Sequence, residues 1–146
     1  MNLNQYEFST VDNFQDFTFF SEGPKGKIKK VIKFFQIQDD PVVYNLAFGD
    51  ETIYGTLNDS VISDNKDTLK ILATVANTIH VFCDYNGNHL IFAQGSTPSR
   101  TRLYQMGISQ AWAEIQKDFT VWGFKGNEWH PFTLKVNYEA FLVKRN

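Results

Sequence analysis

The chain has 146 residues, which fits one domain (1–146) that is long enough to bury its own hydrophobic core. Its formal net charge of −2 gives no global field that would attract nucleic acid or anionic lipid. The single cysteine, Cys83, excludes an internal disulfide. The first residues show no signal-peptide pattern, and no apolar run approaches the roughly 20 residues of a membrane span. We therefore expect a cytoplasmic protein with no membrane partner.

The first part of the chain predicts strands and turns. Closely spaced strands joined by short turns are typical of an antiparallel meander. The expected strands are residues 6–9, 17–21, 27–38, 42–48 and 51–57, with a turn at Gly49-Asp50 before the last of them.

The densest basic run of the chain falls on the long predicted strand. Lys29 and Lys30 are adjacent, so on a strand they point to opposite sides, and acidic residues flank the run. Such lysines are typical of a protected edge strand, and the overall charge does not favour a nucleic-acid partner.

The second part alternates helices and strands. Apolar residues recur at helical spacing from Lys66 to Cys83, and Asp64 with Asp67 fits a capping box at the start of that helix. The apolar run Leu90 to Ala93 lacks polar alternation and predicts a central strand. A second helix is expected at 98–117 and further strands at 120–124 and 138–143. The sum is an α+β domain: a mostly antiparallel sheet, beginning with a strand meander, and two main helices in β-α-β-α-β-β order.

The most informative segment runs from Gly95 to Tyr104. Thr97 can cap the second helix and Pro98 fits its first position. Arg100 and Arg102 follow within the first turns of this helix. Because a helix N-terminus already carries partial positive charge, two arginines there require a compensating anion. At about 100° per residue, Arg100 falls at the edge of the apolar face and Arg102 nearly opposite, on the solvent side.

Three sources of negative charge for Arg100 remain open. The backbone donors around Gly95, Ser96, Thr97 and Ser99 would form with Arg100 a site for a phosphate or carboxylate ligand. An internal ion pair, for example with Asp67 or Asp50, would satisfy the guanidinium equally well. A contact with a partner protein is the third alternative.

The first helix carries Asp67 and Lys70 on its narrow polar side. Together with Tyr104 they would line a cleft beside the Arg100 loop if both helix N-termini lie at one edge of the sheet. The alternative is a solvated stripe with capping residues.

Metal and thiol chemistry have little support in the sequence. His80, His89 and His130 do not stand at metal-ligand spacing, so we expect no metal. Cys83 falls on a buried helix face near a helix C-terminus, and both features raise the pKa of a thiol.

Two resemblances extend this interpretation. The runs Thr68 to Ala76, Gly95-Ser96-Thr97 and Arg100 to Tyr104 resemble a bacterial family of uncharacterised single-domain proteins. The resemblance covers the whole chain and implies no particular activity.

The order of elements is similar to the later part of the GNAT-like acetyltransferase fold, and Arg102 to Ile108 resembles a segment of its last helix. In that fold the loop before the first helix is rich in glycine and holds a coenzyme A pyrophosphate. Here residues 58–64 contain no glycine, so we expect no cofactor.

The sequence thus leads to three functional hypotheses. The first is a binding module with a small anionic ligand at Gly95–Arg102. The second is an enzyme acting on a nucleotide-like or phosphate-bearing substrate, with Arg100 stabilising charge and Asp67 or Tyr104 handling a proton, or a GNAT-like acyltransferase. The third is a protein-interaction or homo-oligomerisation module that uses surface aromatic residues, namely Trp122, Trp129 and Phe132.

Overall fold

The computed structural model describes residues 3–51, 57–58 and 66–146. Its elements in chain order are β1 (Phe8–Thr10), β2 (Asp16–Gly23), β3 (Gly26–Asp39), β4 (Val42–Glu51), β5 (Leu57–Asn58), α1 (Thr68–Asn86), β6 (Leu90–Ala93), α2 (Pro98–Gln110), α3 (Trp112–Asp118), β7 (Phe119–Lys125), β8 (Glu128–Pro131) and β9 (Ala140–Arg145). The predicted fold class, an α+β domain with a mostly antiparallel sheet, is confirmed.

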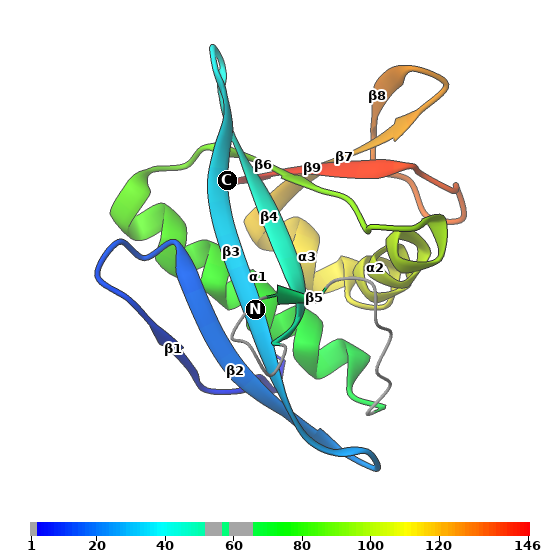
Figure 1. The fold of residues 1–146 in the computed structure, drawn as a ribbon. Coiled ribbons are helices and arrows are strands. Elements are labelled where there is room, and N and C mark those ends of the chain that lie inside the picture. The colour runs from blue at the N-terminus through cyan, green and yellow to red at the C-terminus, as the bar shows by residue number, and fades with distance from the viewer. Residues whose placement is uncertain (1–2, 52–56, 59–65) are drawn as a thin grey trace.

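The described strands form one nine-stranded sheet in the order β1-β2-β3-β4-β6-β9-β7-β8, with β5 beside β4. Among these strands only the β4–β6 pair is parallel. The predicted central position of Leu90–Ala93 is confirmed, because β6 lies between β4 and β9. In Figure 1, β3 and β4 run steeply while β9 and β7 run nearly across the view, which is the accumulated twist of a wide sheet.

The helices pack against one face of this twisted sheet, with α1 running behind β2, β3 and β4 (Figure 1). Alternation along β3 turns Ile32 and Phe34 toward the helices, and Phe34 stacks on Phe82 of α1 with ring centroids 4.4 Å apart. Phe17 and Phe82 are completely buried. The apolar residues of the meander and the helical face of α1 thus form a single core.

The turn predicted at Gly49-Asp50 is wrong, because β4 continues through both residues to Glu51. Cross-strand partners explain the difference. Lys30 Nζ lies 2.5 Å from Asp50 Oδ1, and Lys29 Nζ lies 2.9 Å from Glu51 Oε2. The two acids extend the strand because lysines on the neighbouring strand neutralise them.

The edge-strand interpretation of the lysine run is also wrong. β3 is an interior strand, paired with β2 on one side and β4 on the other. Lys30 shares the inward phase of Ile32 and Phe34 and is only 4% exposed, whereas Lys33 on the opposite phase is exposed.

The predicted helix 98–117 is divided at Ala111, where the backbone (φ −102°, ψ 14°) leaves the helical conformation. Ala111 ends α2 and begins α3. Ile108 and Ile115 are both buried on either side of this break, so the bend keeps both apolar surfaces against the core.

The capping of α1 differs from the prediction as well. Asp64 lies outside the described residues. Asp67 occupies the N-cap position but makes no side-chain capping bond. Its carboxylate is bound by distant groups, described below.

Candidate functional site

The loop from β6 to α2 is folded back on the first turn of the helix. Thr97 Oγ1 accepts a hydrogen bond from the Arg100 amide at 3.2 Å, which confirms Thr97 as the cap and Pro98 as the first helical residue. The Gly95 amide donates to Thr101 Oγ1 at 3.0 Å. A Cβ at Gly95 would stand 2.5 Å from the Thr101 nitrogen, so only glycine fits this approach.

The predicted anion-site residues divide between the surface and the interior. Ser96, Thr97 and Ser99 are exposed, whereas Arg100 is only 6% exposed. Arg102, two residues further along the helix, is exposed. The prediction that the two arginines are not equivalent is confirmed.

Arg100 lines a partly open space of about 400 Å³ between the sheet and the three helices. We call this space the sheet–helix cavity. Its volume lies within the usual range for small-molecule sites, about 300–1,000 Å³. Most lining residues are apolar, and they come from every layer of the core: Leu46 and Phe48 of β4, Ile71, Leu72, Val75, Ala76 and Ile79 of α1, Ile91 and Ala93 of β6, Leu103, Met106 and Ile108 of α2, Ile115 of α3, and Phe119, Val121, Phe141 and Val143 of β7 and β9.

The polar groups of the sheet–helix cavity gather at one end. Lys30 Nζ lies 5.9 Å from the centre of the Phe48 ring, and the Arg100 guanidinium carbon lies 5.9 Å from the centre of the Tyr104 ring. The Phe48 and Tyr104 rings are 6.4 Å apart, and the Tyr104 hydroxyl donates to the Phe48 carbonyl at 3.5 Å. Among the described lining residues, Lys30 and Arg100 carry charge and no carboxylate does.

Neither cation is isolated. Lys30 is paired with Asp50, and Arg100 and Tyr104 each take part in further interactions within the structure. An arginine has five donors in a fixed fork, so a guanidinium can serve more than one acceptor at a time.

The cavity reaches the surface beside two residues of α2, which we call its entrance. Leu103 and Met106 of α2 line the cavity and are 37% and 50% exposed. A Cβ at Gly107 would lie 3.7 Å from Leu72 and Thr68 of α1, so the first turn of α1 packs against the second half of α2.

The structure places Asp67 and Lys70 with Tyr6, while Tyr104 lines the sheet–helix cavity. Asp67 Oδ2 accepts hydrogen bonds from the Tyr6 hydroxyl at 2.6 Å and from Ser21 Oγ at 2.5 Å. Lys70 Nζ lies 4.1 Å from the centre of the Tyr6 ring. Burial, reinforced by the hydrogen bond to Asp67, raises the pKa of Tyr6. The cluster ties the N-terminal segment to α1 and β2.

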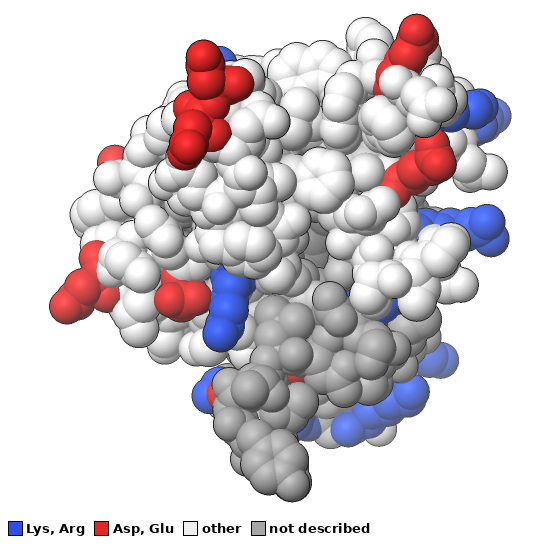
Figure 2. Space-filling model, turned by 45° about the horizontal axis from the view of Figure 1, so that its top comes forward, with Lys and Arg blue, Asp and Glu red and all other residues white. Residues whose placement is uncertain are grey.

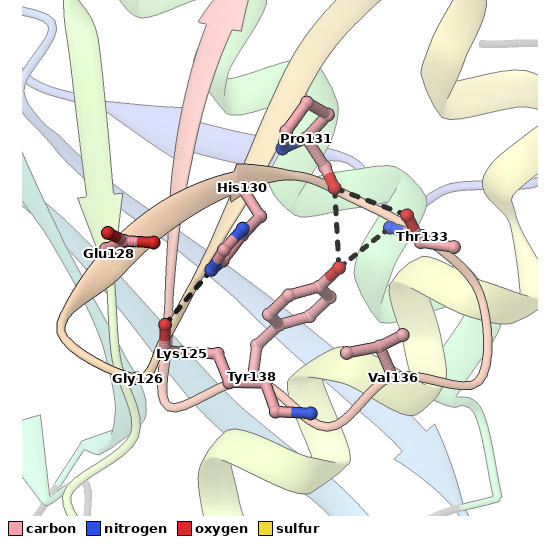
Figure 3. Close-up of a pocket in the computed structure, with 8 residues that line it drawn as sticks. All are labelled: Lys125, Gly126, Glu128, His130, Pro131, Thr133, Val136 and Tyr138. Atoms are coloured by element: carbon pink, nitrogen blue, oxygen red, sulfur yellow. Dashed lines mark hydrogen bonds between the residues drawn. The ribbon is translucent and has the colours of Figure 1, made fainter.

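A second, open hollow lies beside the hairpin of β7 and β8 (Figure 3). Its volume is about 640 Å³, and we call it the hairpin hollow. The Tyr138 hydroxyl accepts from the Thr133 amide at 3.0 Å and donates to the Pro131 carbonyl at 3.4 Å. His130 Nε2 is 3.1 Å from the Lys125 carbonyl. The Tyr138 ring lies on Gly123, where a Cβ would stand 2.2 Å from it.

The aromatic residues proposed for protein contact differ in exposure. Trp129 is 40% exposed and packs against Phe124, with ring centroids 5.1 Å apart. Trp122 is half-buried. Phe132 is only 7% exposed and belongs to the core.

Charge is dispersed over the visible surface. In Figure 2 most acidic and basic side chains lie toward the periphery of the face shown, and the basic ones follow mainly its right border. No basic patch occupies the centre of the described part of this face.

Metal and thiol sites have no geometric support in the described residues. Within 3–51, 57–58 and 66–146, no group of three His, Cys, Asp or Glu side chains could hold a metal ion. His80 Nε2 instead lies 3.6 Å from Asp118 Oδ2. Burial raises the pKa of the Cys83 thiol, as the sequence predicted. No described helix is long and apolar enough to cross a bilayer.

Sequence reasoning missed Lys30 as a site residue. The signal was present, because Lys30 stands two residues before Ile32 and four before Phe34, on the apolar phase of the strand. Its significance depends on α2 placing Arg100 at the same end of the cavity.

Comparisons with known proteins give a family and no relative of known function. A family model described as a family of unknown function, DUF6934, matches residues 2–146. No curated protein and no solved structure matches the chain. Since the family model spans nearly the whole sequence, the chain belongs to the DUF6934 family of unknown function.

Proposed function

We propose that the protein is a binding module for a small anionic molecule with an apolar body, held in the sheet–helix cavity. The observation that carries this proposal is the lining: a mostly apolar cavity whose described charged residues are the two buried cations Lys30 and Arg100. An anion placed at that end gains charge-assisted hydrogen bonds in a poorly hydrated environment.

The proposal modifies the anion site expected at the loop. Thr97 Oγ1 and Thr101 Oγ1 already accept backbone donors of the loop, and Ser96 and Ser99 stand at the surface. Arg100 is the one residue of the expected set that lines the cavity. The site therefore depends on the interior side of α2.

Binding is favoured over catalysis by the same lining. Of the two proton-handling groups suggested by the sequence, Tyr104 stands beside Arg100, whereas Asp67 is bound by Tyr6 and Ser21. An acyl or phosphoryl transfer needs several positioned polar groups around the reacting atoms. The described lining is mostly apolar beyond the Lys30–Arg100 end.

The test compares phenylpropionate with phenylpropanol, which has a similar apolar body and no charge. Titration calorimetry should show binding of the acid, and the methyl NMR signals of Ala76 and Ala93 should shift. Arg100→Gln should weaken binding of the acid about 10- to 100-fold, the loss expected for about 1.5–3 kcal/mol from a charged hydrogen bond.

Arg102→Gln is the matched control, because Arg102 lies on the same helix and is exposed. It should leave affinity unchanged. Equal effects of the two substitutions, or equally tight binding of the alcohol, would contradict the proposal.

A further inference from the structure

We propose that the natural ligand is a medium-chain fatty carboxylate, bound with its carboxylate at the Lys30–Arg100 end and its alkyl chain directed toward Val121. This inference rests on the proposed function and specifies its ligand. It is carried by the polarity, the volume and the shape of the cavity.

The lining of the cavity changes from polar and charged at one end to apolar at the other. The end formed by β3, β4 and the start of α2 contains Lys30, Arg100 and Tyr104. The far end is formed by Ile115, Val121 and other residues that are all apolar, namely Ile79, Phe119 and Val143. A molecule with one anionic head and one hydrocarbon tail matches this gradient, because burying a second polar group at the far end would leave it without a partner.

The volume sets the size of the ligand. If each non-hydrogen atom takes the liquid volume of one water molecule, about 30 Å³, then 400 Å³ accommodates about 13 such atoms. Decanoate is of this size. A long-chain fatty acid or a lipid with two chains is not.

The shape favours a chain over a rigid ring system. Lys30 on β3 and Val121 on β7 are separated by four strand spacings in the order β3-β4-β6-β9-β7. At about 4.8 Å per spacing, the lining extends over about 19 Å along a twisted sheet. This length exceeds that of a small ring system, and a chain with rotatable bonds can follow the twist.

The entrance is suited to the same ligand. Leu103 and Met106 line the cavity and also present apolar side chains to solvent. Methionine is flexible and can move aside for an entering chain. The head would remain near Arg100, on the turn of α2 that precedes the entrance.

The experiment is a calorimetric series of unbranched carboxylates from butanoate to hexadecanoate, each used below the concentration at which it forms micelles. Affinity should rise about fourfold per methylene, which corresponds to about 0.8 kcal/mol, and should reach its maximum near decanoate. Decanol should bind at least tenfold more weakly than decanoate, and Arg100→Gln should remove that difference.

Two comparators make the outcome decisive. Naphthoate is close to decanoate in its number of non-hydrogen atoms but is rigid, and it should bind more weakly. Val121→Phe fills the apolar end and should move the optimum to a shorter chain. If that variant does not fold, the chain-length profile of the unaltered protein still tests the inference.

A flat chain-length profile, an affinity that keeps rising to hexadecanoate, or tighter binding of naphthoate would overturn this inference. None of these results bears on the proposed function, which fails if phenylpropionate binding does not depend on Arg100 more than on Arg102, or if phenylpropanol binds equally tightly.

Discussion

The sheet–helix cavity and the hairpin hollow differ in what surrounds them. The hollow is the larger, about 640 Å³ against about 400 Å³, but it is open, and its hydrogen bonds join its own backbone and side chains. The cavity is less open and mostly apolar, and two buried cations stand at one of its ends. Burial lowers the local dielectric constant, so a buried charge interacts more strongly with an anion than a polar group at the surface does. The proposal for the cavity therefore depends on its lining and not on its volume.

The largest expected effect concerns the buried ion pair at the cavity. Lys30→Met should lower the free energy of unfolding by about 3 kcal/mol, because it leaves Asp50 without its lysine in a mostly buried position. Urea denaturation measures the change. The neighbouring Lys29→Met removes a more exposed pair with Glu51 and should cost less than about 1 kcal/mol. Equal losses would mean that burial does not distinguish the two lysines.

The second-largest effect is expected at the hairpin hollow. Gly123→Ala should destabilise the protein by about 2 kcal/mol, because the new Cβ collides with the Tyr138 ring, which is fixed by hydrogen bonds at Thr133 and Pro131. Affinity for phenylpropionate in the surviving folded protein should not change.

Gly126→Asn is the control for that hairpin. Gly126 has a φ of +59°, which asparagine tolerates, and no atom lies within 4 Å of the position that a Cβ would take there. Its denaturation midpoint should stay close to that of the unaltered protein. A loss of phenylpropionate binding in Gly123→Ala alone would show that the hollow and the cavity are coupled.

A smaller effect of opposite sign is expected at the cavity entrance. Gly107→Ala should raise the free energy of unfolding by about 0.5–1 kcal/mol, because alanine is the better residue inside a helix and the added Cβ makes ordinary contacts at 3.7 Å. The methyl group also enters the cavity lining, so decanoate affinity should fall slightly. Destabilisation would indicate that α1 and α2 are packed more tightly here than the contacts imply.

The smallest expected effect is a change in the pH dependence of stability, at Tyr6, which lies outside both hollows. The pKa of Tyr6 is raised above 10.0 in the folded protein by burial and by Asp67. The unfolded chain therefore loses this proton first, so the contribution of Tyr6 to stability is present below about pH 10 and is lost as the pH rises through the folded pKa. Tyr6→Phe should flatten that alkaline decline in denaturation midpoints measured from pH 8 to 11. An unchanged slope would assign the decline to other groups.

Local patterns predicted the parts of the fold that depend on neighbours in sequence. The start of α2 at Thr97-Pro98 and the inward position of Arg100 followed from capping preferences and helical spacing. The central position of β6 followed from its apolar run.

The rest depended on partners far along the chain. Asp67 became a ligand of Tyr6, which is 61 residues away, instead of a cap. Gly49-Asp50 became strand because Lys30 lies opposite. The cavity itself requires side chains from several strands and all three helices to meet around one space, which no single periodicity contains.

The position of β9 has a consequence for the timing of folding during synthesis. β9 lies between β6 and β7, and it supplies Phe141 and Val143 to the cavity wall. A ribosome-bound chain that has not yet released residues 140–145 can form the meander and the β7–β8 hairpin only as separate units. The wall of the sheet–helix cavity is then completed only when β9 has joined β6 and β7 in the sheet.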